Sequence, residues 1–110
     1  MNPSDVQVVL CTCPAAAVDS LAARVLEARL VACVNVMPEV RSLYRWRGKI
    51  EDETESLLIM KTKRARTDEL IECLEEAHPY EVPEVLVLPV EAGSEPYLDW
   101  VLKETGPESE

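Results

Sequence analysis

The chain has 110 residues and a formal net charge of −10 at pH 7. A chain of this length predicts one domain over residues 1–110. Its acidity argues against nucleic acid as a partner, because phosphate contacts need clustered Lys and Arg. No apolar run reaches the length of a membrane span, and no basic segment followed by an apolar stretch begins the chain, so we expect a cytoplasmic protein without a membrane partner.

The first part of the chain predicts a buried strand followed by a helix. Val6 to Cys11 is a short apolar run rich in β-branched residues, which is typical of a buried strand. Pro14 can open a helix at its first position, where an N–H needs no partner within the helix. The apolar residues that follow recur at helical spacing: Val18, Leu21, Ala22, Val25 and Leu26.

The middle of the chain predicts a long β-hairpin. Residues typical of a β-strand extend from Ala32 to Lys49. Pro38 interrupts them, which indicates a bulge or an edge strand. Arg47-Gly48-Lys49 is the expected tip, and Glu53 to Lys63 is the expected returning strand. Each arm is longer than an ordinary strand of about five or six residues, so part of the hairpin is expected to project beyond the helices.

The side chains of this hairpin suggest a partner surface and ion pairs. Tyr44 and Trp46 lie on one arm, and large aromatic side chains on a projecting ribbon favour a homo-oligomer that covers them. Opposite charges on the two arms predict ion pairs across the hairpin; they are Arg45, Arg47 and Lys49 on one arm and Glu51, Glu53 and Glu55 on the other.

The second half of the chain predicts a helix, a strand and a last short helix. Thr67 is the expected cap of a helix with the apolar stripe Leu70, Ile71, Leu74 and Ala77. Glu84 to Val90 is a nearly all-apolar fourth strand, and Gly93-Ser94 introduces the last helix. We expect a disordered tail from about residue 104 to 110.

The predicted order of elements defines a fold class. The order β-α-β-β-α-β plus a C-terminal helix is that of an α+β, ferredoxin-like plait. In this plait an antiparallel sheet carries both main helices on one face. The sequence therefore predicts a ferredoxin-like βαββαβ domain with a long central β-hairpin and a short C-terminal helix.

The segment from His78 to Glu84 is a candidate functional motif. It contains the only histidine of the chain, and Pro79 and Pro83 bias it toward extended backbone. His78 is thereby held at the exit of a helix and Glu84 at the start of a strand. Any metal or proton-transfer site that uses histidine must include His78.

Several separate motifs resemble the CutA divalent-cation-tolerance proteins, in order and in spacing. The resemblance extends from about Val8 to Trp100. It is carried by Leu10-Cys11-Thr12 with Pro14, Ala32-Cys33-Val34-Asn35, Pro38, Ser42-Leu43-Tyr44-Arg45-Trp46, Gly48-Lys49-Ile50, Lys61-Thr62, His78-Pro79-Tyr80-Glu81-Val82-Pro83-Glu84 and Tyr97-Leu98-Asp99-Trp100.

The resemblance implies a particular assembly. Such proteins are ferredoxin-like protomers in a homotrimer, similar to the PII signalling proteins, with clefts between subunits. We expect the interface or cleft to include Tyr44, Trp46, Tyr80, Glu84 and Trp100. For Tyr80 and Trp100, burial in the core is the alternative.

The resemblance also implies a cofactor, copper or another divalent cation. Bacterial relatives are credited with a copper site that uses a cysteine of the first strand and a histidine before the Pro-Tyr pair, and Cys11 and His78 match these positions. Thiolate and imidazole suit copper or zinc. Some relatives carry two adjacent histidines, whereas this chain has Ala77-His78, so one candidate ligand is missing.

Two ligands are too few for a closed tetrahedral site. Cys13, Glu81, Glu84 or a neighbouring subunit would have to complete it. The alternative for His78 is a bond to the last carbonyls of its helix. The alternative for the cysteines is that all of them are small buried packing residues, namely Cys11, Cys13, Cys33 and Cys73.

Three functions are compatible with these features to different degrees. The favoured hypothesis is a trimeric protein that binds divalent copper or zinc ions in metal-ion tolerance. The alternative is a PII-like signalling or scaffold trimer that binds a small ligand or protein partner in its clefts without catalysis. An enzyme using His78 with Glu81, or Cys11 as nucleophile, is disfavoured, because the chain has no second histidine, no Gly-rich phosphate loop and no triad at suitable spacing.

Overall fold

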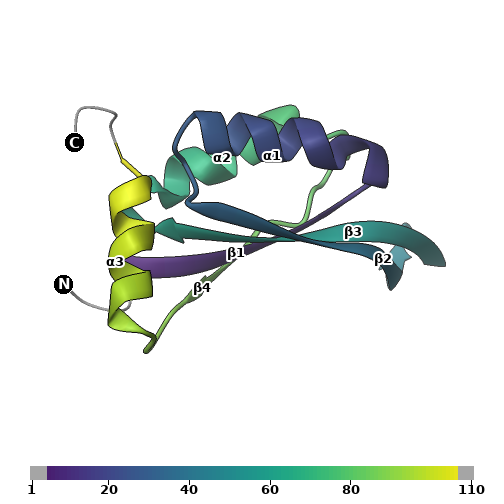
Figure 1. Ribbon diagram of the computed structural model, residues 1–110. Coiled ribbons are helices and arrows are strands. Elements are labelled where there is room, and N and C mark those ends of the chain that lie inside the picture. The colour runs from purple at the N-terminus through teal and green to yellow at the C-terminus, as the bar shows by residue number, and fades with distance from the viewer. Residues whose placement is uncertain (1–4, 107–110) are drawn as a thin grey trace.

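The computed structural model describes residues 5–106, and its elements follow the predicted order (Figure 1). Four strands form one antiparallel sheet in the order β2-β3-β1-β4. The elements are β1 (Val6–Cys13), α1 (Val18–Glu27), β2 (Cys33–Trp46), β3 (Lys49–Lys63), α2 (Thr67–Ala77), β4 (Leu86–Pro89) and α3 (Glu95–Glu104). Helices α1 and α2 cover one face of the sheet, which confirms the predicted α+β, ferredoxin-like fold.

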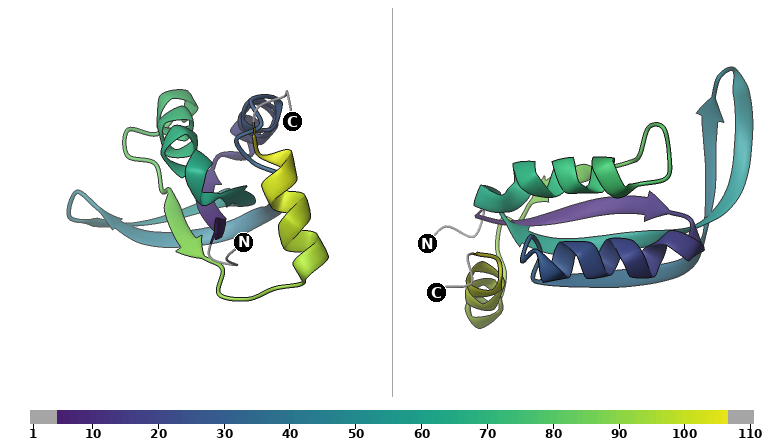
Figure 2. Two further views of the ribbon diagram at one scale, coloured as in Figure 1. Left: turned by 90° about the vertical axis from the view of Figure 1, so that its left-hand side faces the viewer. Right: turned by 90° about the horizontal axis from the view of Figure 1, so that it is seen from above.

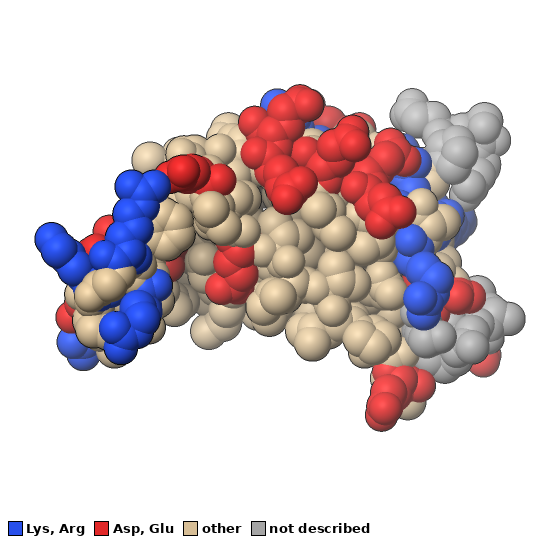
Figure 3. All heavy atoms as spheres, turned by 180° about the vertical axis from the view of Figure 1, so that it is seen from behind, with Lys and Arg blue, Asp and Glu red and all other residues tan. Residues whose placement is uncertain are grey.

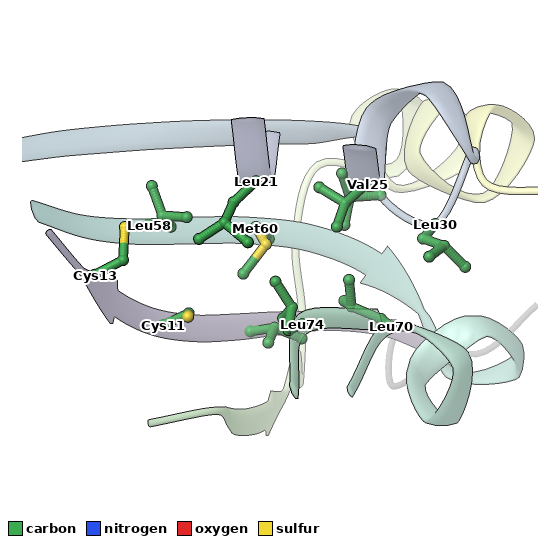
Figure 4. Packing of buried hydrophobic residues seen from close by; sticks show 11 residues of the cluster. Cys11, Cys13, Leu21, Val25, Leu30, Leu58, Met60, Leu70 and Leu74 are labelled. Atoms are coloured by element: carbon green, nitrogen blue, oxygen red, sulfur yellow. The ribbon is translucent and has the colours of Figure 1, made fainter. Parts of the chain in front are cut away.

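The hydrophobic core lies between the sheet and these two helices. Burial alternates along β1, so Val9, Cys11 and Cys13 point toward the helices. Each helix buries one stripe, because its core residues are four positions apart. The side chains that meet those of β1 are Leu21 and Val25 of α1, Leu58 and Met60 of β3, and Leu70 and Leu74 of α2 (Figure 4).

Strands β2 and β3 form the long hairpin, whose outer part extends beyond the helices (Figure 2). The tip is a two-residue turn, in which Arg47 has φ 49° and Gly48 has φ 81°. Two residues with positive φ are typical of a type I′ turn, whose twist matches that of the strands. Trp46 pairs with Lys49, so Lys49 belongs to β3, which begins there rather than at Glu53 as predicted.

A β-bulge interrupts β2 at Pro38 and Glu39. The register with β3 shifts between Met37 and Val40, and Glu39 has φ 59°. Strand β2 is also an edge of the sheet, so the missing N–H of Pro38 leaves no ladder bond unmade on the outer side. Pro38 therefore lies both at a bulge and on an edge strand, which are the two alternatives that the sequence left open.

The boundaries of α2 and β4 differ from the prediction. A 3-10 turn at Arg64–Arg66 leads directly into α2, so Thr67 is already helical and its side chain makes no cap bond. The Thr67 hydroxyl instead donates to Oε1 of Gln7 on β1 at 2.5 Å. Strand β4 covers only Leu86–Pro89, rather than Glu84 to Val90, since its pairing with β1 ends there.

Helix α3 lies across the end of the sheet that is farthest from the hairpin tip (Figures 1 and 2). It packs Leu98 and Val101 against Val6 of β1. Within residues 5–106, no helix combines the length and the apolar character needed to cross a membrane.

The C-terminal end is ordered farther than predicted. Glu104 ends α3, and the next two residues are buried. The carbonyl oxygen of Gly106 accepts a hydrogen bond from Nε of Arg29 at 2.7 Å. The predicted tail from about 104 thus begins too early, and residues 107–110 lie outside the described part of the chain.

The face of the sheet opposite α1 and α2 has no helical layer over most of its area (Figure 1). The strand register places apolar side chains of neighbouring strands side by side on this face. These side chains are half-buried or exposed, and they are Val8, Leu10, Met37, Leu57, Ile59, Leu86 and Leu88. The subunit therefore presents a broad apolar surface.

Candidate functional site

His78 joins the end of α2 to the end of β1. It leaves the helix with ψ 139°, as the following proline favours, and its N–H bonds to the Leu74 carbonyl at 2.9 Å. The alternative considered from the sequence was that the His78 ring bonds the last carbonyls of its helix, and the ring does not do so. Instead Nε2 lies 2.8 Å from the carbonyl oxygen of Thr12.

Both ring nitrogens of His78 are engaged. The Thr12 carbonyl can only accept, so Nε2 must donate to it, and Nδ1 accepts from the N–H of Tyr80 at 3.1 Å. These two contacts fix the orientation of the ring. The side chain is only 7% exposed, and the Tyr80 ring tilts against it with the centroids 4.7 Å apart. A metal ion could bind His78 only after one of these bonds is broken.

Cys11 is a fully buried thiol, 0% exposed in the core. Burial, and then the nearby Cys13, Glu84 and Glu55, raise the pKa of Cys11 to about 12. Burial and Glu55 also raise the pKa of Cys13. Both cysteines therefore stay protonated near neutral pH and pack like small apolar residues, whereas metal ions are bound by thiolates.

The two predicted metal ligands thus do not form a ready site within one subunit. Over residues 5–106, no group of three or more His, Cys, Asp or Glu side chains is arranged to hold a metal ion. Ligation by Cys11 and His78 would require a local rearrangement and at least one further ligand.

A cleft of about 440 Å³ lies between the hairpin and the segment that follows α2. We call it the hairpin cleft. The hairpin contributes two aromatic rings and two carboxylates, and the connecting segment contributes the opposite wall. The lining residues are Tyr44, Trp46, Glu51 and Glu53 from β2 and β3, and Pro79, Tyr80, Glu81 and Val82 from the connecting segment.

The strand register explains why aromatic and acidic side chains meet here. Tyr44 pairs with Glu51, and paired residues project from the same face of a hairpin. Arg45 pairs with Ile50 and projects from the other face. The ion pairs predicted between the Arg45 arm and the glutamate arm are therefore not formed as expected. The pair formed between the arms is Arg41 with Asp52, at 2.8 Å.

The two tyrosines that line the cleft donate hydrogen bonds to carboxylates. The Tyr44 hydroxyl donates to Oε1 of Glu53, and the Tyr80 hydroxyl donates to Oε2 of the buried Glu55, both at 2.6 Å. The hydrogen bond to Glu53 raises the pKa of Tyr44 to about 12. Burial, followed by the hydrogen bond to Glu55, also raises the pKa of Tyr80. Both phenols are therefore neutral donors at neutral pH.

Arg47, at the hairpin tip, contacts two of the residues that line the cleft. Its Nη2 donates to Oε1 of Glu81 at 2.9 Å, and its guanidinium carbon lies 5.2 Å from the centroid of the Trp46 ring. The Arg47 and Glu81 side chains are about 70% exposed, so water screens the ion pair. The contact is a weak bridge from the tip to the connecting segment.

The structure separates the remaining predicted residues from this cleft. Glu84 is exposed and does not line it, although its charge contributes to the raised pKa of Cys11. Trp100 lies on α3, at the far end of the sheet, where its ring is 5.6 Å from that of Tyr97. Of the five predicted interface or cleft residues, Tyr44, Trp46 and Tyr80 come together.

Two acidic lining residues, Glu51 and Glu53, were not predicted as site residues, and a third, Glu81, was considered only as a further metal ligand or as a partner of His78. The charge pattern of the sequence assigned the first two to ion pairs across the hairpin. The Arg47-Gly48 dipeptide is compatible with a two-residue turn, and the register that follows from such a turn pairs Glu51 with Tyr44. The Arg47-Gly48 dipeptide was therefore the feature of the sequence that could have placed Glu51 beside Tyr44.

Comparison with known proteins finds relatives over nearly the whole chain. The family model described as CutA1 divalent ion tolerance protein matches residues 7–104. Protein CutA of Mus musculus is 47% identical over 100 residues, which cover 90% of this chain and 56% of that protein. The divalent-cation tolerance protein CutA of Escherichia coli O139:H28 is 48% identical over 95 residues, which cover 86% of this chain and 85% of that protein.

Solved structures agree with the fold. A divalent cation tolerance protein from Thermus thermophilus superposes with a TM-score of 0.88 at 40% identity, covering 92% of this chain and 99% of that one. The PII-like protein CutA from Nostoc in its apo form superposes with a TM-score of 0.86 at 35% identity, covering 91% of this chain and 97% of that one. The chain spans only 56–60% of the length of the vertebrate relatives that it matches.

Proposed function

Because this chain belongs to the family of CutA1 divalent ion tolerance proteins, we propose that it acts in the tolerance of the cell to divalent metal ions, as a homotrimer that binds copper or zinc. The observation that carries this proposal is the family match, which extends over residues 7–104. In this function the metal ion is bound and not transformed, so the protein performs no catalysis.

The proposed ligands are Cys11 and His78. The ring of His78 bonds the carbonyl of Thr12, the neighbour of Cys11, which supports a site where β1 meets the end of α2. Binding there would break one hydrogen bond of His78 and deprotonate a thiol whose pKa is raised to about 12. Metal binding would therefore release a proton and weaken as the pH falls. Glu84 or a neighbouring subunit would supply the further ligands.

The apolar surface of the sheet supports self-association. Met37, Leu86 and Leu88 are about half exposed there, and soluble proteins rarely leave a large continuous apolar patch in water. Figure 3 shows Lys and Arg near both ends of the molecule, with a broad area of few charges between them. Three copies per assembly is the number that the resemblance to CutA proteins implies.

The cytoplasm is the proposed location, with neither nucleic acid nor a membrane as partner. The net charge of −10 supports the exclusion of nucleic acid. One similar structure, from Archaeoglobus fulgidus, is described as a periplasmic protein. Fractionation of cells that express the tagged chain tests the location, and recovery from the periplasm would contradict it.

Growth in the presence of metal tests the function. Cells without the gene should stop growing at lower copper or zinc concentrations than cells with it, and the wild-type gene should restore tolerance. The variants Cys11→Ala and His78→Asn should fail to restore it while remaining folded. Cys73→Ala is the matched control, because Cys73 is a half-buried thiol outside the proposed site. Equal growth of all strains would contradict the proposal.

A second candidate function is a PII-like signalling or scaffold trimer that binds a small ligand without catalysis. The hairpin cleft favours it, because about 440 Å³ lies within the range of small-molecule sites and the cleft combines apolar walls with a few polar groups. Saturable binding of a small molecule that changes with the lining residues, in the absence of metal, would test it.

A further inference from the structure

The hairpin cleft carries two kinds of group that attract cations. Glu51, Glu53 and Glu81 supply carboxylates, and the rings of Tyr44 and Trp46 supply aromatic faces. A carboxylate binds an ammonium or guanidinium group by charge-assisted hydrogen bonds, and an aromatic face attracts the same groups through its quadrupole. The two kinds of group line one cleft of about 440 Å³.

The chain itself already places a cation against two of these lining residues. The guanidinium of Arg47 lies over the Trp46 ring, with 5.2 Å between its carbon and the ring centroid, and Nη2 of Arg47 donates to Glu81 at 2.9 Å. One cationic group is thus held by an aromatic face and a carboxylate together. Because the Arg47 side chain is 69% exposed, little other than these contacts fixes it, and a competing cation can displace it.

We propose that the hairpin cleft binds a small organic cation that carries a guanidinium or primary ammonium group. Trp46 provides the aromatic face, Glu81 provides the hydrogen-bonding carboxylate, and Arg47 is the internal group that the ligand displaces. The proposal names the ligand class for the second candidate function and rests on that function. It is independent of metal binding at Cys11 and His78.

The lining favours an organic cation over a metal ion. Glu53 already accepts the Tyr44 hydroxyl, which leaves less of its capacity for a metal. Aromatic rings add nothing to the oxygen shell of a divalent ion, but they contribute directly to binding of an organic cation. The volume also favours a small molecule over a long basic peptide, which would need an extended groove.

Tryptophan fluorescence gives a direct test. The chain has two tryptophans, so in the Trp100→Phe background Trp46 is the only one and its emission reports on the cleft. Agmatine, which carries a guanidinium and a primary ammonium group, is titrated into the full-length protein of known oligomeric state. We expect a saturable change in Trp46 emission, with sodium chloride at equal ionic strength giving no saturable change.

Matched variants distinguish binding in the cleft from non-specific attraction of a cation to the acidic protein. Glu81→Gln should weaken agmatine binding by about tenfold or more, because a charge-assisted hydrogen bond is lost. Glu75→Gln removes an exposed carboxylate of α2 outside the cleft and should leave binding unchanged. Arg47→Asn should tighten binding, because it removes the internal competitor and keeps a residue that tolerates positive φ at the tip.

Three results would overturn the proposal. They are no saturable response to agmatine, equal weakening by Glu81→Gln and Glu75→Gln, and an equal response to magnesium chloride at the same ionic strength. None of these results bears on copper or zinc binding, which is measured with other variants. A failure of the cleft proposal is therefore distinguishable from a failure of the metal proposal.

Discussion

Nε2 of His78 lies 2.8 Å from the carbonyl oxygen of Thr12, and this one contact ties the end of α2 to the end of β1. The same ring accepts the N–H of Tyr80, which turns the chain toward the hairpin cleft. The only histidine of the protein is thus a structural link between the core and the cleft, whatever its role toward metal.

His78→Ala should destabilise the folded protein. The substitution leaves the carbonyl of Thr12 and the N–H of Tyr80, which meet the ring in a part-buried position, without their partner, and this costs about 1–3 kcal/mol for each group that water does not reach. Urea unfolding at fixed protein concentration measures the change. His78→Asn should lose less, since an amide oxygen can still accept the Tyr80 N–H. A change below about 0.5 kcal/mol in both variants would show that the link is not important.

Stability should fall in alkaline solution because of Cys11. Its pKa is raised to about 12 in the folded protein from the ordinary cysteine value of 9.0, so between these values the unfolded chain gives up a proton that the folded one keeps. The folded state therefore loses stability as the pH rises from about 9 to 12. Melting temperatures at about pH 8 and about pH 10 measure the loss.

Cys11→Ala should reduce this alkaline loss, and Cys73→Ala should leave it as in the wild type. Some loss will remain in the Cys11 variant, because the pKa values of Cys13, Tyr44 and Tyr80 are raised as well. The assignment to Cys11 would be refuted by an identical pH profile in the wild type and the Cys11 variant.

Cys11 and Cys13 should resist thiol reagents in the native state. Both side chains are 0% exposed and protonated, whereas thiol reagents require an accessible thiolate. In a variant that lacks Cys33 and Cys73, dithionitrobenzoate at about pH 8 should label no thiol in buffer and both thiols in denaturant. Rapid labelling of either residue in buffer would contradict the buried position.

Gly48→Ala should weaken the hairpin. Gly48 has φ 81°, and an added methyl group meets no atom within 4 Å, so the cost is backbone strain of about 1–2 kcal/mol rather than a clash. Gly48→Asn should cost less, since asparagine tolerates the left-handed region. Chemical unfolding of both variants tests this order, and an alanine variant as stable as the wild type would be inconsistent with the type I′ turn.

Leu88→Lys should dissociate the proposed trimer. Leu88 is 47% exposed on the apolar face of the sheet, where a lysine would bury a charge between subunits. Leu26→Lys is the matched control, because Leu26 is 41% exposed on α1, which covers the other face. Light scattering should give three times the 12.3 kDa chain mass for the wild type and the Leu26 variant. A Leu88 variant of wild-type mass would place the interface elsewhere.

Periodicity predicts most of this fold, and the length of the hairpin turn accounts for the main error at the site. The strands and helices follow from apolar spacing, which is a local property. The pairing within the hairpin does not, because it depends on the length of the turn. A three-residue tip from Arg47 to Lys49 would have paired Arg45 with Glu51, whereas the observed two-residue turn pairs Arg45 with Ile50. Tyr44 therefore shares a face with Glu51, and Arg45 does not.

The metal ligands show a second limit of sequence reasoning. Cys11 and His78 are recognised by their positions in motifs, but a motif does not give the protonation of a buried thiol or the partners of a ring nitrogen. Those properties depend on packing around β1 and on the turn at Pro79 and Tyr80, which form only in the folded chain.

Calorimetric titration of the reduced protein with copper and zinc tests the central claim most directly. The account predicts saturable binding by the trimer at high salt, with proton release, lost in Cys11→Ser and His78→Asn variants that keep the wild-type mass. Weak binding that is abolished by salt and unchanged in both variants would contradict it, because an acidic surface alone would then be collecting the ions.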